Sequence, residues 1–135
     1  MADGNRKIRD YRDLIVWQQS RRLVKTVYEA TRHFPKEELF GLTQQVRRAA
    51  VSVPSNIAEG YGRGSRKEYI RFLYTARGSL YEVQTQLVLA EDLGYLSDEQ
   101  VATITQEIGQ CSRLLHGLIA ALGKKDGALE PGGRS

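Results

Sequence analysis

The sequence has few of the residues that form disulfides or bind metals, with one cysteine and two histidines among 135 residues, and it has only three prolines. The single cysteine, Cys111, cannot form an internal disulfide, which favours a reducing, cytoplasmic setting. The histidines, His33 and His116, are far apart and lack the spacing of a HExxH metal site. We therefore expect no metal and no cofactor, and a chain of this length needs no such staple to bury a core.

Long apolar runs are also missing. No run approaches the ~20 residues that a membrane-spanning helix needs, so we expect no membrane partner. The first residues, "MADGNRKIRDYRD", contain no apolar core and therefore do not resemble a signal peptide. Together these absences predict a soluble protein of the cytoplasm.

Neither sign of charge dominates strongly. The chain has 20 basic and 16 acidic side chains, a net charge of +4, and a pI near 9.3. Residues 1–34 contain eight basic and four acidic side chains, so much of the excess lies there. This balance is compatible with nucleic-acid binding but does not require it.

Apolar residues recur every three or four positions in four segments, and no segment shows the alternation of a strand. The apolar stripes cover residues 16–34, 46–57, 69–90 and 101–122. The pattern predicts an all-α protein, an antiparallel up-down four-helix bundle over residues 10–123. We expect a flexible N-terminus over residues 1–9, an end to the fourth helix at Gly123, and a disordered tail over residues 124–135.

Capping residues mark where the helices begin. Ser65 with Glu68 forms a capping box before the third helix, and Ser97 with Gln100 repeats this spacing before the fourth. Thr43 is the candidate N-cap of the second helix. These positions predict short turns between successive helices.

The stretch "VSVPSNIAEGYGRGSRKE", residues 51–68, interrupts the apolar pattern of the second helix. On a helical wheel, polar side chains form a second stripe beside the apolar one: Gln45, Arg48, Ser52, Asn56 and Glu59. Serine and asparagine are poor helix formers, because they compete for backbone hydrogen bonds. Their presence favours a structural hydrogen-bonded network inside the bundle or at an interface. A solvated face and a functional site are the alternatives.

Pro54 and three glycines shape the same stretch. A proline inside a helix leaves one carbonyl without its usual donor, and Ser52 is well placed to help near such a kink. Gly60, Gly62 and Gly64 then supply a turn that can use positive φ.

The run "LTQQVRRAAVSVPSNIAEGYGRGSRKEYIRFLYTARGSLYEVQTQL", with "DLIVWQ" before it and "GYL" after it, resembles the 23S rRNA intervening-sequence protein family. The family pattern Gln-x-x-Arg-Ala-x-x-Ser-x-x-x-Asn-Ile-Ala-Glu-Gly fits residues 45–60 without a departure. Arg63 and the "GSLYE" of residues 78–82 fit as well. The resemblance covers about residues 10–96.

This resemblance implies a cytoplasmic four-helix bundle that assembles into a homo-oligomer, a five-fold ring (pentamer). Some members of the family are encoded in insertions within ribosomal RNA genes. The accessory variability proteins of diversity-generating retroelements, a related branch, work with a reverse transcriptase and nucleic acid. The resemblance therefore implies RNA or DNA, and a reverse transcriptase or another nucleic-acid enzyme, as candidate partners.

Basic side chains gather in three places. The candidate nucleic-acid-binding residues are Arg63, Arg66, Lys67 and Arg71 around the turn into the third helix, and Arg21, Arg22 and Lys25 on the first helix. Arg47 and Arg48 form a third pair. Aromatic residues that could stack on bases are sparse near these patches, and Tyr61 and Tyr69 are the only close candidates. We therefore expect recognition of shape and charge rather than of base sequence.

Enzyme chemistry has little support. Cys111 lies on an apolar stripe, where a buried inert thiol is the simpler interpretation. The "GYGRG" run follows a helix and lacks the Gly-Lys-Ser/Thr of a phosphate loop, and Glu59 and Glu82 lack the Glu-x-x-His partners of a bundle metal site. We expect no catalytic residue, and an undetected hydrolase is the weakest rival.

The sequence thus predicts a non-enzymatic oligomeric bundle that binds structured RNA or an RNA–DNA hybrid through basic patches. The alternative is a structural or protein-interaction scaffold that binds no nucleic acid. Apolar residues on more than one face of the first helix, including Ile15 and Trp17, predict self-association.

Overall fold

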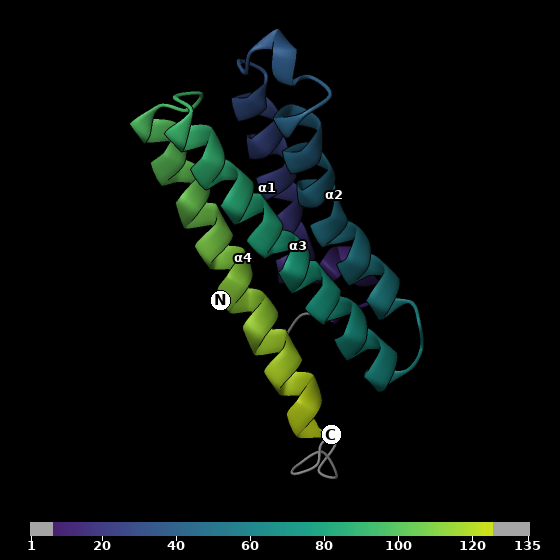
Figure 1. Cartoon of the computed structure of the whole chain (residues 1–135). Coiled ribbons are helices and arrows are strands. Elements are labelled where there is room, and N and C mark those ends of the chain that lie inside the picture. Colours follow the sequence, from purple (N-terminus) through teal and green to yellow (C-terminus); the bar gives the residue numbers. More distant parts are fainter. Residues whose placement is uncertain (1–6, 126–135) are drawn as a thin grey trace.

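The computed structural model describes residues 7–125, which form four α-helices and two short 3-10 turns. The helices are α1 (Ile15–Thr31), α2 (Leu42–Tyr61), α3 (Arg66–Asp92) and α4 (Asp98–Lys125), and the turns are η2 (Tyr11–Asp13) and η3 (Lys36–Glu38) (Figure 1). No strand occurs in this part of the chain. The predicted all-α class and the four helices are therefore confirmed. Most of the predicted N-terminal and C-terminal flexible segments lies outside the described residues.

Each helix packs against two others: α1 and α3 both contact α2 and α4, and the α2–α3 interface is the most extensive (Figure 1). Two hydrogen bonds join α1 to α4. The Gln19 amide donates to the Gln110 side chain at 2.6 Å, and the Thr26 hydroxyl donates to Glu107 at 3.2 Å. Residue numbers rise along one helix as they fall along the other, so these two helices run in opposite directions. The arrangement is compatible with the predicted up-down bundle.

The core lies where the four apolar stripes meet. Side chains with no measurable exposure include Leu23, Ile57, Leu73, Leu80 and Leu115, which come from all four helices. Burying each such side chain stabilises the fold by roughly 1.5–3 kcal/mol relative to its exposed state. The apolar periodicity therefore predicted the buried face of every helix.

The capping box predicted at α4 is complete, whereas the one predicted at α3 is formed only in half. The Ser65 hydroxyl accepts the Glu68 N–H at 3.2 Å, but the Glu68 carboxylate pairs with Arg71 instead of accepting the Ser65 N–H. At the start of α4, the Ser97 hydroxyl accepts the Gln100 N–H at 3.1 Å, and the Gln100 side chain accepts the Ser97 N–H at 2.9 Å. These bonds satisfy N–H groups that the helix itself leaves without acceptors.

Two predicted helix ends are wrong. Thr43 is not an N-cap: α2 begins one residue earlier, and Thr43 is buried within it. The Glu38 carboxylate, from the preceding 3-10 turn, accepts the Leu42 N–H at 3.1 Å and takes the role expected of Thr43. Gly123 does not end α4, which continues to Lys125. A glycine ends a helix by adopting positive φ, and Gly123 does not do so.

Positive φ occurs in the described chain at Gly64, before α3, and at Gly94, before α4. The glycine-rich turn therefore uses one of its three glycines in this way. Gly60 instead lies inside α2, buried against α3. No helix of the described residues is both long enough and apolar enough to span a membrane.

Candidate nucleic-acid interface

The short polar side chains of α2 meet α3 in one small cluster, which consists of Ser52, Asn56 and Ser79. The Ser52 and Ser79 hydroxyls are 2.7 Å apart and join the two helices directly. The Asn56 amide donates to the Ser52 carbonyl at 2.8 Å and to the Ser52 hydroxyl at 2.9 Å. Ser52 and Asn56 are half-buried and Ser79 is buried, so these bonds satisfy groups that water reaches poorly.

The structure does not bring all five predicted network residues together. Gln45 and Arg48 are exposed, and neither contacts the cluster through a hydrogen bond to another described residue. Glu59 is also exposed, and its carboxylate pairs with Arg63 at 3.3 Å, four residues further along the chain. Arg48 and Glu59 therefore do not pair with each other.

Ser79 is the cluster member that the helical wheel of α2 could not supply, because it lies on α3. The sequence does offer one indication of it: Ser79 lies beside Leu80 in the "GSLYE" run, next to the stripe of alanine and larger apolar residues. The sequence predicts that Ser52 helps to satisfy backbone groups near Pro54, but the structure shows other bonds for its hydroxyl. The Ser52 hydroxyl bonds Ser79 and Asn56, and the Asn56 amide reaches a backbone carbonyl one turn earlier in the helix.

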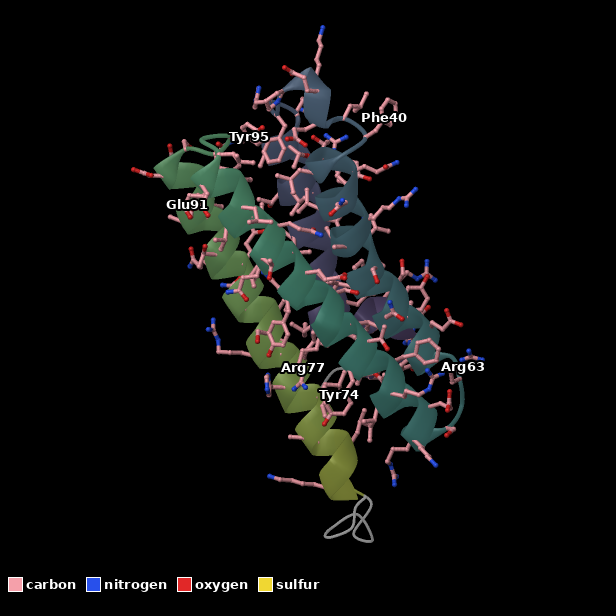
Figure 2. The ribbon with its side chains drawn as sticks, viewed as in Figure 1. Phe40, Arg63, Tyr74, Arg77, Glu91 and Tyr95 are labelled. Atoms are coloured by element: carbon pink, nitrogen blue, oxygen red, sulfur yellow. The ribbon has the colours of Figure 1, made fainter. Side chains whose placement is uncertain are left out.

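The turn between α2 and α3 carries the densest basic group. We call Arg63, Arg66, Lys67 and Arg71 the turn cluster, and all four side chains are exposed. Glu59 and Glu68 lie among them, so the six side chains have a net charge of +2. Figure 2 shows Arg63 at this turn.

An aromatic ring fixes two of these guanidinium groups. Arg63 lies over the Phe72 ring at 4.8 Å from its centroid, and Arg71 lies over the same ring at 4.5 Å. Arg71 also pairs with Glu68 at 2.8 Å. That hydrogen bond lowers the pKa of Glu68 and raises the pKa of Arg71, so both groups are charged at neutral pH. Cation–π contact reduces the freedom of the two arginines without neutralising them.

The two tyrosines that the sequence offers as stacking candidates near the turn contact each other. Tyr61 and Tyr69 meet edge to face, with ring centroids 5.9 Å apart. Burial raises the pKa of Tyr69 to about 12. The contact between Phe72 and Arg63 could not be predicted from a helical period, because it crosses the turn between two helices.

The predicted patch on α1 is present as three exposed side chains, Arg21, Arg22 and Lys25. The Arg21 guanidinium lies over the Trp17 ring at 5.6 Å, and Tyr11 meets the same indole edge to face at 5.3 Å. Trp17 is therefore partly covered.

Two features bear on enzyme chemistry. Burial raises the pKa of Cys111 to about 12, so its sulfur is a protonated thiol at neutral pH rather than a nucleophilic thiolate. Within the described residues, no group of three or more His, Cys, Asp or Glu side chains is placed to hold a metal ion.

The four-helix architecture and the motif at the α2–α3 junction agree with one protein family. A model of the family described as 23S rRNA-intervening sequence protein matches residues 12–117. The chain belongs to this family. The match spans α1, α2, α3 and most of α4, so it extends the resemblance seen in residues 10–96 into the fourth helix. A comparison with curated proteins gave no match.

Proposed function

We propose that this intervening-sequence family member is a non-enzymatic, antiparallel up-down bundle of the cytoplasm. It forms homo-oligomers and binds the phosphate backbone of structured RNA or an RNA–DNA hybrid. The observation that carries the proposal is the turn cluster, in which four exposed basic side chains surround one turn and Phe72 fixes two of them. Guanidinium groups held in place lose less side-chain entropy when they bind phosphate.

The turn cluster supports backbone binding rather than base reading. Its side chains are long and charged, and the Phe72 ring is already covered by guanidinium groups, which leaves little of it for base stacking. In an oligomer, identical clusters would repeat around one axis, and their charges would add. Such an array suits a long polyanion.

Replacing Arg63, Arg66 and Lys67 simultaneously by glutamine should lower the affinity for nucleic acid. It should also make that affinity depend less steeply on salt concentration. Each phosphate contact that is lost makes the slope of log K against log salt shallower by about 0.9 on a duplex. Fluorescence anisotropy with a labelled RNA duplex across a salt series measures both quantities.

The matched control changes the same amount of charge elsewhere, with glutamine at Lys36, Arg113 and Lys124, which are exposed and outside the cluster. Equal losses in the two variants would mean that net charge alone matters. If the turn variant keeps the affinity and slope of the unaltered chain, these residues are ordinary solvated surface. If the unaltered chain does not bind even at low salt, the scaffold alternative is correct.

Self-association is supported by exposed apolar residues on α3. Tyr74, Tyr81 and Val88 are each about half exposed and are spaced by seven residues, so they lie along one side of the helix. Leu89, on the neighbouring side of the helix, and Leu93, at its C-cap, are also about half exposed. We call the five residues the α3 stripe. The sequence pointed to the face of α1 around Ile15 and Trp17 for self-association; both side chains are half-buried, so the α3 stripe exposes more apolar surface.

Light scattering on the full chain should therefore give a mass several times 15.2 kDa, nearest to five-fold. Replacing Tyr74 and Tyr81 together with glutamate should reduce that mass, because a charge cannot be buried in an apolar interface without a partner. A monomer at micromolar concentration in the unaltered chain would contradict the proposal.

A protein-interaction scaffold is the second candidate, and the α3 stripe is the observation that favours it. In that case the stripe receives another protein, of which a reverse transcriptase or another nucleic-acid enzyme is the candidate. Binding of nucleic acid across salt concentrations separates the two functions, since a scaffold gives no RNA binding of its own.

A further inference from the structure

A groove of about 590 Å³ opens on the outer face of α1 and α2, beside the turn that joins them. It is lined by Tyr28, Leu39, Phe40, Thr43, Gln44, Arg47, Arg48, Val51 and Ser52. Its volume lies in the range of small-molecule sites. Figure 2 shows Phe40 near the end of the bundle where η3 joins α2, and Arg63 of the turn cluster toward the other end of α2. The groove is therefore separate from the turn cluster.

Phe40 is the most exposed large apolar side chain of the described residues, with 83% of its surface accessible to water. It lies between the 3-10 turn η3 and the first residue of α2, which fixes its backbone at both sides. An aromatic ring left in water gains nothing for folding. The exposed Phe40 ring is therefore free to stack against another planar ring.

The groove also carries positive charge that no acid offsets. Arg47 lies over the Tyr28 ring at 4.5 Å and donates to the Thr31 hydroxyl at 2.8 Å, so its guanidinium is held in one place. Arg48 is exposed and makes no ion pair with another described residue. No lining residue is an Asp or a Glu. The amide of Gln44 adds both a donor and an acceptor beside these charges.

We propose that this groove binds an unpaired base of a nucleic-acid strand, which stacks on Phe40 while its neighbouring phosphates contact Arg47 and Arg48. The inference rests on the proposed function and adds the substrate class, a single-stranded segment. A base inside a duplex cannot stack on the ring, whereas unpaired bases commonly stack on aromatic side chains next to arginines. Gln44 is placed to contact the edge of the base.

The charge of the groove favours a nucleic acid as its occupant. Arg47 and Arg48 have no acid beside them in the lining, and phosphates would neutralise them when they lose water. The exposed surface of α3 carries charges of both signs: Arg77 lies over the Tyr74 ring at 4.7 Å (Figure 2), and Glu82, Glu91 and Asp92 are also exposed. A second copy docked through this surface is the rival occupant, and the oligomer mass of the Phe40→Ala variant tests it.

The test compares two probes on the full chain by fluorescence anisotropy: an unstructured oligouridine and an RNA duplex of the same length. Phe40→Ala should weaken oligouridine binding about five- to hundredfold, the usual worth of one stacked base, and leave duplex binding unchanged. Phe40→Trp should keep the affinity, because it keeps a ring, and oligouridine should quench its added fluorescence. Ile8→Ala, which removes an exposed apolar side chain outside the groove, the turn cluster and the α3 stripe, is the control and should leave oligouridine binding unchanged.

Three results would overturn this inference. Phe40→Ala could bind oligouridine as tightly as the unaltered chain, or weaken both probes equally, which would show that no base stacks on the ring. Phe40→Ala could lower the oligomer mass in light scattering, which would assign the groove to a second copy. In each case the turn-cluster variant still decides the proposed function, since it should weaken duplex binding whatever happens at Phe40.

Discussion

Gly60→Ala is expected to destabilise the protein, although alanine is the better helix former. A Cβ built at Gly60 would lie 2.8 Å from the Cβ of Phe72 and 3.2 Å from the backbone oxygen of Tyr69. Neither atom can swing aside, because one belongs to a backbone and the other is attached directly to one. Overpacking of this kind costs about 1–3 kcal/mol, which exceeds the roughly 0.5–1 kcal/mol gained by removing a helical glycine.

The matched control for this substitution is Gly78→Ala on α3. Gly78 is also helical, but it is exposed, and a Cβ there meets nothing within 4 Å. It should therefore raise the free energy of unfolding by about 0.5–1 kcal/mol. Denaturant unfolding at one protein concentration measures both variants. If the two substitutions change stability in the same direction, the close approach of α2 and α3 at Gly60 does not hold.

Asn56→Ala is expected to lower the free energy of unfolding by about 1–3 kcal/mol. The substitution removes both hydrogen bonds from the Asn56 amide and leaves the Ser52 hydroxyl with Ser79 alone. Glu59→Ala should change stability by less than about 1 kcal/mol, because its ion pair with Arg63 is exposed to water. Denaturant unfolding and light scattering on both variants test these values.

Ser55→Ala is the control for Asn56→Ala, since Ser55 is the exposed neighbour on the same helix and reports helix propensity alone. A double-mutant cycle of Ser52→Ala with Ser79→Ala should give a coupling free energy of about 0.5–1.5 kcal/mol. If Asn56→Ala keeps its stability and assembly but loses RNA binding, the cluster is a binding site and its structural role is refuted.

These two predictions concern the same junction. Gly60 lets α2 approach α3 closely near the turn, and the Ser52–Ser79 hydroxyl pair joins the helices further along. A helix that carries serine, asparagine, glycine and a proline would be weak in isolation. Packing against α3 therefore supplies stability that local propensity does not. The same packing positions Arg63 over the Phe72 ring of α3.

Local sequence determined the four helices and their buried faces. A period of three to four residues is a property of one segment, so Leu73 and Leu80 could be assigned to the core without knowledge of their neighbours. The caps at Ser65 and Ser97 are local for the same reason, since each bond spans three residues. The cap of α2 was missed because its acceptor, Glu38, lies in the preceding 3-10 turn rather than at the usual capping position.

Only the tertiary structure decided which polar and aromatic groups meet. Ser79 faces Ser52 because of the register between α2 and α3, and a single-helix pattern contains no information about register. Phe72 lies beneath two arginines because the chain reverses between them. The groove takes Tyr28 from α1, Phe40 from a turn and Arg48 from α2. The sequence alone determined which side chains each helix buries. The distance and register between helices determined which polar and aromatic side chains contact each other where two helices meet.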